Sequence, residues 1–287
     1  MSTETAISAV VVSFHTGDIL NACLTRLLEC PRCQEVILVD NGNRADVVRD
    51  LLAWQTAEPR LKLVTGHGNI GFGRGCNLGA KQASSPILAF VNPDCVLDPD
   101  SLARLADLAA SPVPVLVGGH IRDETGVEQR GGRRGTLSLW SACVSFSGLG
   151  RPGEQAGIWR DFNRNREVLP EEPIETPVVS GALMVTRRDV FWQIGGFDEA
   201  YFLHVEDIDL CHRYGLAGFK VIFDPLARAT HIGGTSQTAA WRVEIAKLRS
   251  FLYYFWKFSR PPLGRLLVLL IAPLLTLAIL TRIFASK

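Results

Sequence analysis

The chain lacks the cysteine patterns that bind structural metals or form disulfide frameworks. Its seven cysteines are scattered over 287 residues, and the one Cys-x-x-Cys, from Cys30 to Cys33, has no second pair to accompany it. A zinc site of this type needs a second pair of ligands, and a disulfide framework uses an even, patterned set. We therefore expect reduced thiols in a cytoplasmic compartment.

The chain also lacks an excess of charge of either sign and a secretion signal. Its formal net charge is +1 at pH 7, which gives no general attraction to nucleic acid. Its first residues contain no basic segment followed by an apolar one, because a predicted strand begins at Ala6. We predict no nucleic-acid partner and no signal segment.

What the chain does contain is a composition and an alternation typical of α/β proteins. Hydrophobic residues make up 47% and charged residues 21%, as in globular proteins, and the length allows one large domain or two small ones. Short apolar runs alternate with helical periodicity, which predicts a doubly wound, mostly parallel sheet. The strands predicted in the first half are Ala6–Phe14, Glu35–Asp40, Arg60–Val64, Ile87–Val91 and Val113–Gly119.

The strand Ile87–Val91 runs into Asn92-Pro93-Asp94, and the predicted site is organised around this strand end. Pro93 has no N–H to donate, so strand pairing should end there. Ligands of open α/β sheets bind at the carboxyl ends of the strands. Asp94 is therefore a candidate ligand of a metal or phosphate site, with helix capping as the alternative.

A glycine-rich turn precedes that strand and leads into a predicted helix. Glycines let backbone N–H groups approach a ligand closely. Three of them fit the dinucleotide motif G-x-G-x-x-G, namely Gly66, Gly68 and Gly71. An NAD(P)-dependent oxidoreductase using Gly66–Gly71 is thus an alternative function. Against it, three further glycines would lie inside the cofactor helix, each at a cost of about 1 kcal/mol: Gly73, Gly75 and Gly79.

The second half of the chain holds two segments with the character of binding loops. A predicted strand from Pro177 to Thr186 is interrupted by Ser180 and Gly181, and a glycine inside a strand favours a bulge or a ligand close to the backbone. The polar stretch from about Leu149 to Pro177 is typical of a lid or binding loop, or of a solvated insertion.

Carboxylates cluster at the start of a predicted helix that follows an aromatic-rich turn. Glu206, Asp207 and Asp209 lie close together behind apolar residues, and stabilisation of the helix terminus is the simplest role for them. Partial burial would raise the pKa of a carboxyl group there toward that of a general base. Farther on, His231 is predicted in a polar, glycine-flanked turn after the strand Phe219–Phe223, as a structural residue or a ligand.

Taken in order, these pieces resemble the inverting nucleotide-sugar glycosyltransferases of family 2, and within them the bacterial rhamnosyltransferase-type enzymes that build surface polysaccharides. Each piece is weak alone, whereas the ordered set is specific, and it covers roughly residues 6–236. The set comprises Val10–Phe14, Val39–Gly42, Asn69–Gly71, Asn77, Asn92–Asp94, Ser180–Ala182, Gly195–Asp198, Glu206–Asp209 and His231.

The resemblance implies the GT-A fold, an α/β, Rossmann-like, mixed but mostly parallel sheet flanked by helices, in a catalytic domain over residues 1–236. It implies that Asp207 is the catalytic base, with Glu206 beside it. Nucleotide and donor binding would fall to Ser13, Asp40, Asn69, Gly71, Asn77, Asn92, Asp94, Ser180 and Gly181, with Asp40 on the nucleotide base.

The resemblance also implies a divalent cation, Mn²⁺ or Mg²⁺, held by Asp94 and His231. Asn92 replaces the first aspartate of the family's acidic pair, which leaves one carboxylate. A cation on the leaving nucleoside diphosphate would neutralise its charge as the glycosidic bond breaks, and a histidine ligand suits Mn²⁺ somewhat better than Mg²⁺. The expected reaction moves a sugar, such as rhamnose, from a dTDP- or UDP-sugar to a glycan or polyprenyl-linked acceptor. A non-catalytic nucleotide-sugar-binding membrane protein is a further alternative.

Residues 237–287 form a predicted helical, membrane-associating segment that ends in an apolar tail. Within Leu263–Phe284 the uninterrupted stretch is about 15 residues long, whereas a spanning helix needs about 20, and Pro273 would kink it. A short or tilted span, an in-plane anchor and a helix buried against a partner all fit, and the basic flanks favour the membrane. With a lipid-linked acceptor, the expected location is the cytoplasmic face of the bacterial inner membrane.

Overall fold

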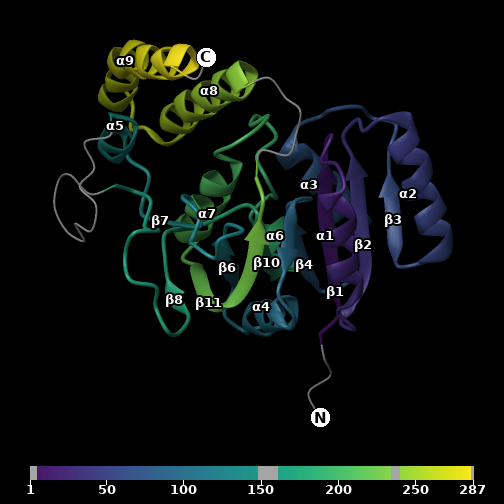
Figure 1. Cartoon of the computed structure of the whole chain (residues 1–287). Coiled ribbons are helices and arrows are strands. Elements are labelled where there is room, and N and C mark those ends of the chain that lie inside the picture. Colours follow the sequence, from purple (N-terminus) through teal and green to yellow (C-terminus); the bar gives the residue numbers. More distant parts are fainter. Residues whose placement is uncertain (1–4, 148–160, 234–239, 286–287) are drawn as a thin grey trace.

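The computed structural model describes residues 5–147, 161–233 and 240–285. The described strands form a nine-stranded sheet, which lies between layers of helices (Figure 1). Its strands are β1 (Ile7–Ser13), β2 (Cys33–Asp40), β3 (Leu61–Val64), β4 (Ile87–Val91), β5 (Cys95–Leu97), β6 (Val115–Arg122), β8 (Ile174–Glu175), β10 (Leu183–Arg187) and β11 (Lys220–His231). A separate two-stranded sheet pairs β7 (Arg133–Arg134) with β9 (Val178–Val179).

The sheet is mixed, with a parallel half built from the first strands of the chain. Its order is β3-β2-β1-β4-β10-β6-β11-β5, with β8 beside β11. The four strands from β3 to β4 are all parallel, as the strand–helix alternation predicts. Beyond them, β10 is antiparallel to both of its neighbours, and β11 runs parallel to β6. The predicted α/β fold with a mixed sheet flanked by helices is confirmed.

Alternating side chains on the strands build a hydrophobic core on each face of the sheet. In β1, Val10 and Val12 belong to one core, and Ile7, Ala9 and Val11 belong to the other, because successive side chains of a strand point to opposite faces. The first core is covered by α3 (Phe72–Gln82), α6 (Arg188–Gln193) and α7 (Glu206–Leu216). The second is covered by α1 (Ile19–Leu28), α2 (Ala45–Ala57) and α4 (Ser101–Ala109).

The glycines of the glycine-rich turn do lie inside a helix, contrary to the objection raised from the sequence. Helix α3 contains Gly75 and Gly79, both buried against β1. A Cβ atom on Gly79 would stand 2.4 Å from Val10 Cγ1, and one on Gly75 would stand 2.8 Å from Val12 Cγ1. Close packing of the helix on the sheet therefore offsets the conformational cost of glycine.

Strand pairing defines three of the predicted segments more closely. The strand before Pro93 ends at Val91, as predicted, and a new strand, β5, begins at Cys95 and pairs with β11. His231 is the last residue of β11 and lies opposite Cys95, so it is not in a turn. The predicted strand from Pro177 to Thr186 is divided into β9 and β10, with Ser180 and Gly181 between them.

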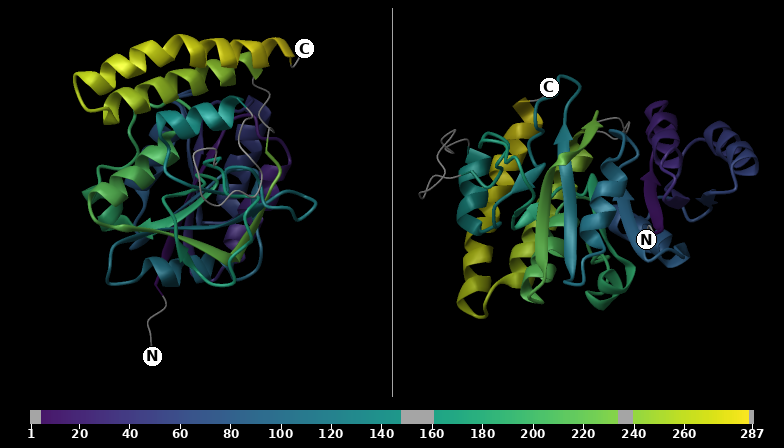
Figure 2. Two further views of the ribbon diagram at one scale, coloured as in Figure 1. Left: turned by 90° about the vertical axis from the view of Figure 1, so that its left-hand side faces the viewer. Right: turned by 90° about the horizontal axis from the view of Figure 1, so that it is seen from below.

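Helices α8 (Ala240–Phe258) and α9 (Leu263–Ala285) lie side by side across one end of the sheet (Figures 1 and 2). Three buried aromatic residues of α8, Phe251, Tyr254 and Phe255, belong to the same core as the sheet residues. Among the described residues, no helix combines the length and apolar character that crossing a membrane requires. The proposed division at residue 236 stays a prediction, although α8 shares its core with the preceding domain.

Candidate active site

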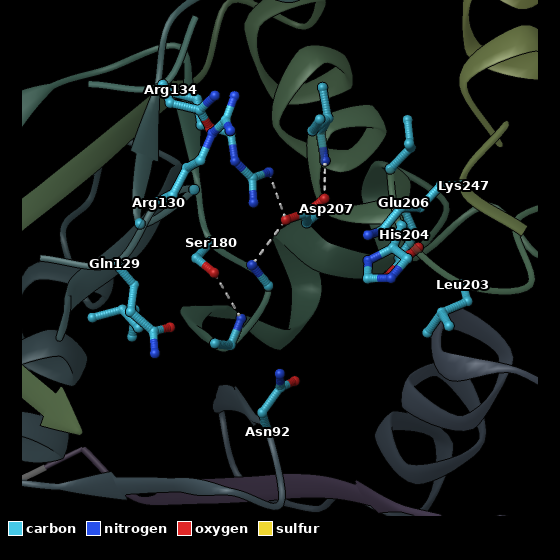
Figure 3. A pocket seen from close by; sticks show the side chains of 18 of the residues that line it. Asn92, Gln129, Arg130, Arg134, Ser180, Leu203, His204, Glu206, Asp207 and Lys247 are labelled. Carbon is cyan, nitrogen blue, oxygen red and sulfur yellow. Dashed lines mark hydrogen bonds and ion pairs between the residues drawn. The ribbon is translucent and has the colours of Figure 1, made fainter. Parts of the chain in front are cut away.

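A cavity of about 450 Å³ lies where β4 ends and α7 begins (Figure 3). Six residues singled out from the sequence line it, although they come from segments far apart in the chain: Asn92, Ser180, Gly181, Glu206, Asp207 and His231. Helix α8 closes one side with Glu244, Lys247 and Phe251. The fold therefore brings predicted donor, catalytic and metal residues from distant parts of the chain together in one place.

Asp94 and His231 are adjacent, as predicted for a shared metal site. His231 Nε2 lies 3.0 Å from Asp94 Oδ1 and 3.3 Å from Asn92 Nδ2. The pairing of β5 with β11 produces this contact, since Cys95 lies opposite His231. Within the described ranges, no group of three or more His, Cys, Asp and Glu side chains is placed to hold a metal ion.

Gln129 orients the ring of His231. Its Oε1 lies 2.7 Å from His231 Nδ1, and its Nε2 donates a hydrogen bond to the carbonyl oxygen of His231. Because Oε1 can only accept, Nδ1 carries the ring proton in this arrangement. Nε2 then faces Asp94 and Asn92. Support of this kind behind a histidine is typical of metal ligands.

Asp207 is the most completely bonded carboxylate in the cavity. Its Oδ2 accepts hydrogen bonds from Arg134 Nη1 at 2.9 Å and from the Gly181 N–H at 3.1 Å, and its Oδ1 accepts one from the Ile208 N–H at 2.8 Å. Burial acts to raise the pKa of Asp207, but the Arg134 charge and these donors outweigh it, so the pKa is lowered. A carboxylate has about four acceptor positions, which leaves one for an incoming hydroxyl.

Glu206, directly before it, is in the opposite situation. It is buried, and its Oε2 has no hydrogen-bond partner among the described residues. Burial raises the pKa of Glu206, and the neighbouring negative charge of Asp207 raises it further. At neutral pH the pair is therefore best described as a protonated Glu206 beside an ionised Asp207.

Two residues with left-handed backbone conformations lead into these carboxylates. His204 has φ +66° and Val205 has φ +72°, and a β-branched residue adopts such a conformation rarely. Strain of this kind persists where the surrounding structure holds it and often marks functional sites. Burial lowers the pKa of His204 to about 4, so its imidazole is neutral at pH 7.

Two predicted nucleotide residues from the first strands, Ser13 and Asp40, lie outside the lining of this cavity. Asp40 ends β2, where its Oδ1 accepts hydrogen bonds from the N–H groups of Gly42 and Asn43 and its Oδ2 accepts one from Thr65 Oγ1 at 2.6 Å. Ser13, at the end of β1, accepts a hydrogen bond from Asn43 Nδ2 at 3.1 Å. These contacts order the carboxyl ends of β1 and β2, and a contact of Asp40 with a nucleotide base stays a prediction.

Of the remaining predicted donor residues, Gly71 and Asn77 contact the segment before α7, and Asn69 binds within its own turn. Asn69 Oδ1 accepts a hydrogen bond from the Gly71 N–H, and a Cβ on Gly71 would stand 2.6 Å from the carbonyl oxygen of Phe202. Asn77 binds Phe197 through both ends of its amide, with N···O distances of 2.9 Å. In the structure, Asn77 therefore holds a loop in place, and its predicted role in nucleotide binding stays a prediction.

Three contributors to the site were missed from the sequence: Gln129, Arg134 and Lys247. Arg134 lies in Gly131-Gly-Arg-Arg-Gly135, which reads as a loop, and only its approach to Asp207 reveals a role. Lys247 forms a salt bridge of 2.7 Å with Glu244 in α8. Part of the predicted 149–177 binding loop, residues 149–160, lies outside the described residues, whereas Phe162 and Asn163 line the cavity.

Two solved structures have a similar fold. One is the mannosyltransferase PcManGT from Pyrobaculum calidifontis in complex with GDP-Man and Mn²⁺, with a TM-score of 0.63 and 14% identity over 99% of this chain and 75% of that one. Another is GalNAc-T7 with UDP, GalNAc and Mn²⁺, with a TM-score of 0.62 and 16% identity over 90% of this chain and 51% of that one. At this identity the likeness shows the fold, which is the GT-A fold expected.

Sequence comparison identifies the family. The family model described as "Glycosyl transferase family 2" matches residues 8–195. The chain is 32% identical over 244 residues to the N-acetylglucosaminyl-diphospho-decaprenol L-rhamnosyltransferase of Mycobacterium tuberculosis, with 77% of this chain and 74% of that one covered. It is 38% identical over 236 residues to the rhamnosyltransferase WbbL of Escherichia coli, with coverage of 77% and 81%. The chain belongs to glycosyl transferase family 2 and resembles its rhamnosyltransferases.

Membership of this family excludes the oxidoreductase alternative, and the contacts of the dinucleotide-like motif agree. At the start of α3 the Phe72 N–H donates to the carbonyl oxygen of Phe202 at 3.0 Å. The segment that leads into α7 thus covers the helix terminus at which a pyrophosphate would bind in a dinucleotide enzyme.

The raised pKa of Glu206 predicts a stability effect that depends on pH. Between the unfolded pKa, near 4.5, and the higher folded value, the native state binds the extra proton, so its stability falls as pH rises. Glu206→Gln removes this loss. We expect the variant to gain stability over the wild type by at most about 1.4 kcal/mol per pH unit across that window.

Urea unfolding at several pH values checks this expectation. The measurements run from about pH 5 to about pH 8, which is the range in which the protonation of Glu206 affects stability. Glu124→Gln, at an exposed position, is the matched control and should show no such trend. A difference between Glu206→Gln and the wild type that stays constant with pH would contradict an uncharged Glu206.

Proposed function

We propose that this family 2 glycosyltransferase moves a sugar, rhamnose by likeness to its relatives, from a dTDP- or UDP-activated donor to a lipid-linked or other glycan acceptor. The observation that carries the proposal is the arrangement of one cavity. The cavity is lined by Asp207, a carboxylate suited to proton removal. It is also lined by His231, which forms with Asp94 a pair suited to binding a cation. Two rhamnosyltransferases are 32% and 38% identical to the chain, and one of them is named for a polyprenyl-diphosphate acceptor.

In the proposed reaction Asp207 accepts the proton of the acceptor hydroxyl. The oxygen forms a bond to the anomeric carbon of the donor sugar as the bond to the nucleoside diphosphate breaks, on the opposite side of the ring. The bonding electrons leave with the diphosphate, and the anomeric configuration inverts. Asp207 suits this task because it is ionised and retains one free acceptor position.

Asp94 and His231 would hold the divalent cation, Mn²⁺ or Mg²⁺. The donor set fits, because a carboxylate oxygen and an imidazole nitrogen lie next to each other, and Gln129 holds the imidazole through its other nitrogen. Two protein ligands suffice when phosphate oxygens and water complete the shell. When bound, the cation would neutralise charge on the leaving diphosphate. The Mn²⁺ in the two solved structures of the same fold supports this assignment.

Membrane association through residues 237–287, at the cytoplasmic face of the bacterial inner membrane, is also part of the proposal. It is supported by exposed apolar side chains on α9, with exposed fractions from 46% to 78%: Leu263, Leu266, Leu267, Leu269 and Leu270. Exposed aromatic and basic residues accompany them, namely Trp241, Arg242, Arg249, Tyr253, Trp256, Arg260 and Arg265. This combination suits a helix pair that lies on a bilayer surface rather than crossing it.

Donor binding tests the class of the enzyme and its metal. We expect dTDP- or UDP-sugars to raise the melting temperature of the wild type in the presence of Mn²⁺, and Asp94→Ala to weaken this binding at least tenfold, because the cation loses its only carboxylate. Asp50→Ala, a change of an exposed carboxylate, is the control. A thermal shift with NAD or NADP but with no nucleotide sugar would contradict the proposal.

Removal of the proposed base tests catalysis. Asp207→Asn should lower transfer from dTDP-rhamnose or UDP-sugars to an N-acetylglucosaminyl-diphospho-polyprenol by about 10²–10⁴-fold and leave the donor dissociation constant nearly unchanged. Rates and binding are measured on the same preparation. Donor binding by a wild-type protein that transfers nothing would instead support a non-catalytic nucleotide-sugar-binding protein.

The membrane surface is tested with vesicles. The triple variant Leu266→Gln, Leu267→Gln, Leu270→Gln should bind anionic vesicles at least tenfold more weakly than the wild type in a flotation assay, since burial of each leucine contributes about 1.5–3 kcal/mol. Leu216→Gln changes a leucine that is 68% exposed on α7 and should leave binding unaffected. Equal flotation of all three proteins would locate any membrane contact elsewhere.

A further inference from the structure

The charge of the two adjacent carboxylates is divided unequally by their surroundings. Glu206 and Asp207 are both buried and both line the cavity, and two negative charges this close in a buried site cannot both be stable. Both begin α7, whose N-terminus favours one negative charge without choosing between them. Something outside the helix must therefore decide which residue carries the proton.

The hydrogen-bond donors that could determine which residue is protonated come from one small element, the two-stranded sheet of β7 and β9. β7 and β9 form a two-stranded sheet in which Arg134 lies opposite Val178. Arg134 extends from β7 to Asp207 Oδ2, and Gly181, just beyond β9, donates its N–H to the same oxygen. Both contacts go to Asp207, and Glu206 Oε2 receives none from the described residues. The two-stranded sheet therefore acts on one member of the pair.

The path of the Arg134 side chain depends on a glycine. Gly131 has φ +92°, and a Cβ atom there would stand 2.8 Å from Arg134 Nη2. The neighbouring Arg133 has a different task, since it forms a salt bridge of 2.9 Å with Glu128 and is buried. Side chains of consecutive strand residues diverge, so the arginine pair contributes one structural and one cavity-facing guanidinium.

Other charged side chains near the pair have their ion-pair partners elsewhere, so they do not favour the ionised form of Asp207 by contacting it. Lys247 is paired with Glu244, and Arg130 lies 3.6 Å from Asp161. The imidazole of His204 is neutral because burial lowers its pKa to about 4. Arg134 on β7 and Asp209 on α7 act electrostatically on the pair. The charge of the pair acts in turn on Cys76 of α3, Cys211 of α7 and His204 before α7. Glu244 and Lys247 of α8 act on His204 and line the same cavity.

We propose that Arg134 is the positioning residue that places the negative charge on Asp207 and leaves the proton on Glu206. The proposal rests on the function proposed above, in which Asp207 is the base, and adds the group that keeps it ionised and oriented. The protonated Glu206 would then be a neutral neighbour that does not repel the diphosphate donor. Without Arg134, the single charge is shared between the two carboxylates and the base is ionised for only part of the time.

Direct observation of the proton tests this without any assay of activity. In protein labelled with ¹³C at the Asp and Glu carboxyl carbons, NMR titration of the wild type should show a protonated glutamate at neutral pH whose signal is absent in Glu206→Gln. In Arg134→Met, a protonated aspartate signal should appear at the same pH. An unchanged pattern in Arg134→Met would overturn the proposal, whether or not the protein proves to be a transferase.

Kinetics give the second readout. In Arg134→Met the acidic limb of the kcat/KM profile should move to higher pH by at least one unit, a tenfold loss at pH values below it, with the donor dissociation constant within about threefold of the wild type. Arg134→Lys keeps the positive charge, so the acidic limb of this variant should lie close to its wild-type pH. Arg49→Met, an exposed arginine, controls for loss of one positive charge.

The competing role for Arg134 is direct contact with the diphosphate. In that case Arg134→Met would weaken donor binding at least tenfold and leave the acidic limb and the carboxyl signals in place, which overturns the proposal. Circular dichroism of each variant establishes that it folds, and Arg134→Lys provides the same comparison if Arg134→Met does not. Failure of every protein, including the wild type, to bind a nucleotide sugar would instead count against the function proposed above.

Discussion

The structure depends on satisfying three acidic side chains that α7 places in the interior. Asp207 is bound by Arg134 from β7 and by the N–H of Gly181. Asp209 is fully buried and accepts hydrogen bonds from Arg213 at 2.6 Å and from Lys257 of α8 at 2.5 Å. Glu206 has no such donor at Oε2. An unpaired buried charge is costly, so these contacts join the two-stranded sheet, α7 and α8 around one point.

This requirement connects stability with function. Lys257 also binds Asp198 at 2.6 Å, so the contact that docks α8 orders the loop before α7 as well. Helix α8 in turn supplies one wall of the cavity. The segment 237–287, expected to serve the membrane, thus contains a helix that lines the cavity. A lipid-linked acceptor would be brought to the cavity by the same helix pair whose exposed leucines and arginines suit a bilayer surface.

Much of the fold could be predicted from the sequence because its signals are local. The strand Ile87–Val91 and the carboxylates that open α7 were placed correctly by apolar runs and by helix signals. Errors arose where pairing between distant segments decided the outcome. His231 was placed in a turn, yet it continues β11 because its backbone lies opposite Cys95. The objection to helical glycines also failed, because only packing against Val10 and Val12 explains Gly79 and Gly75.

The sequence by itself determined the order of the motifs, and with it the family, the strand ends and the acidic pair. Only the tertiary structure decided which of two adjacent carboxylates is ionised, because the difference between them is made by Arg134, some seventy residues away in the chain. It alone showed that Gln129 fixes the ring of His231. Solvation and long-range hydrogen bonds set these properties, and neither can be read from residue type or spacing.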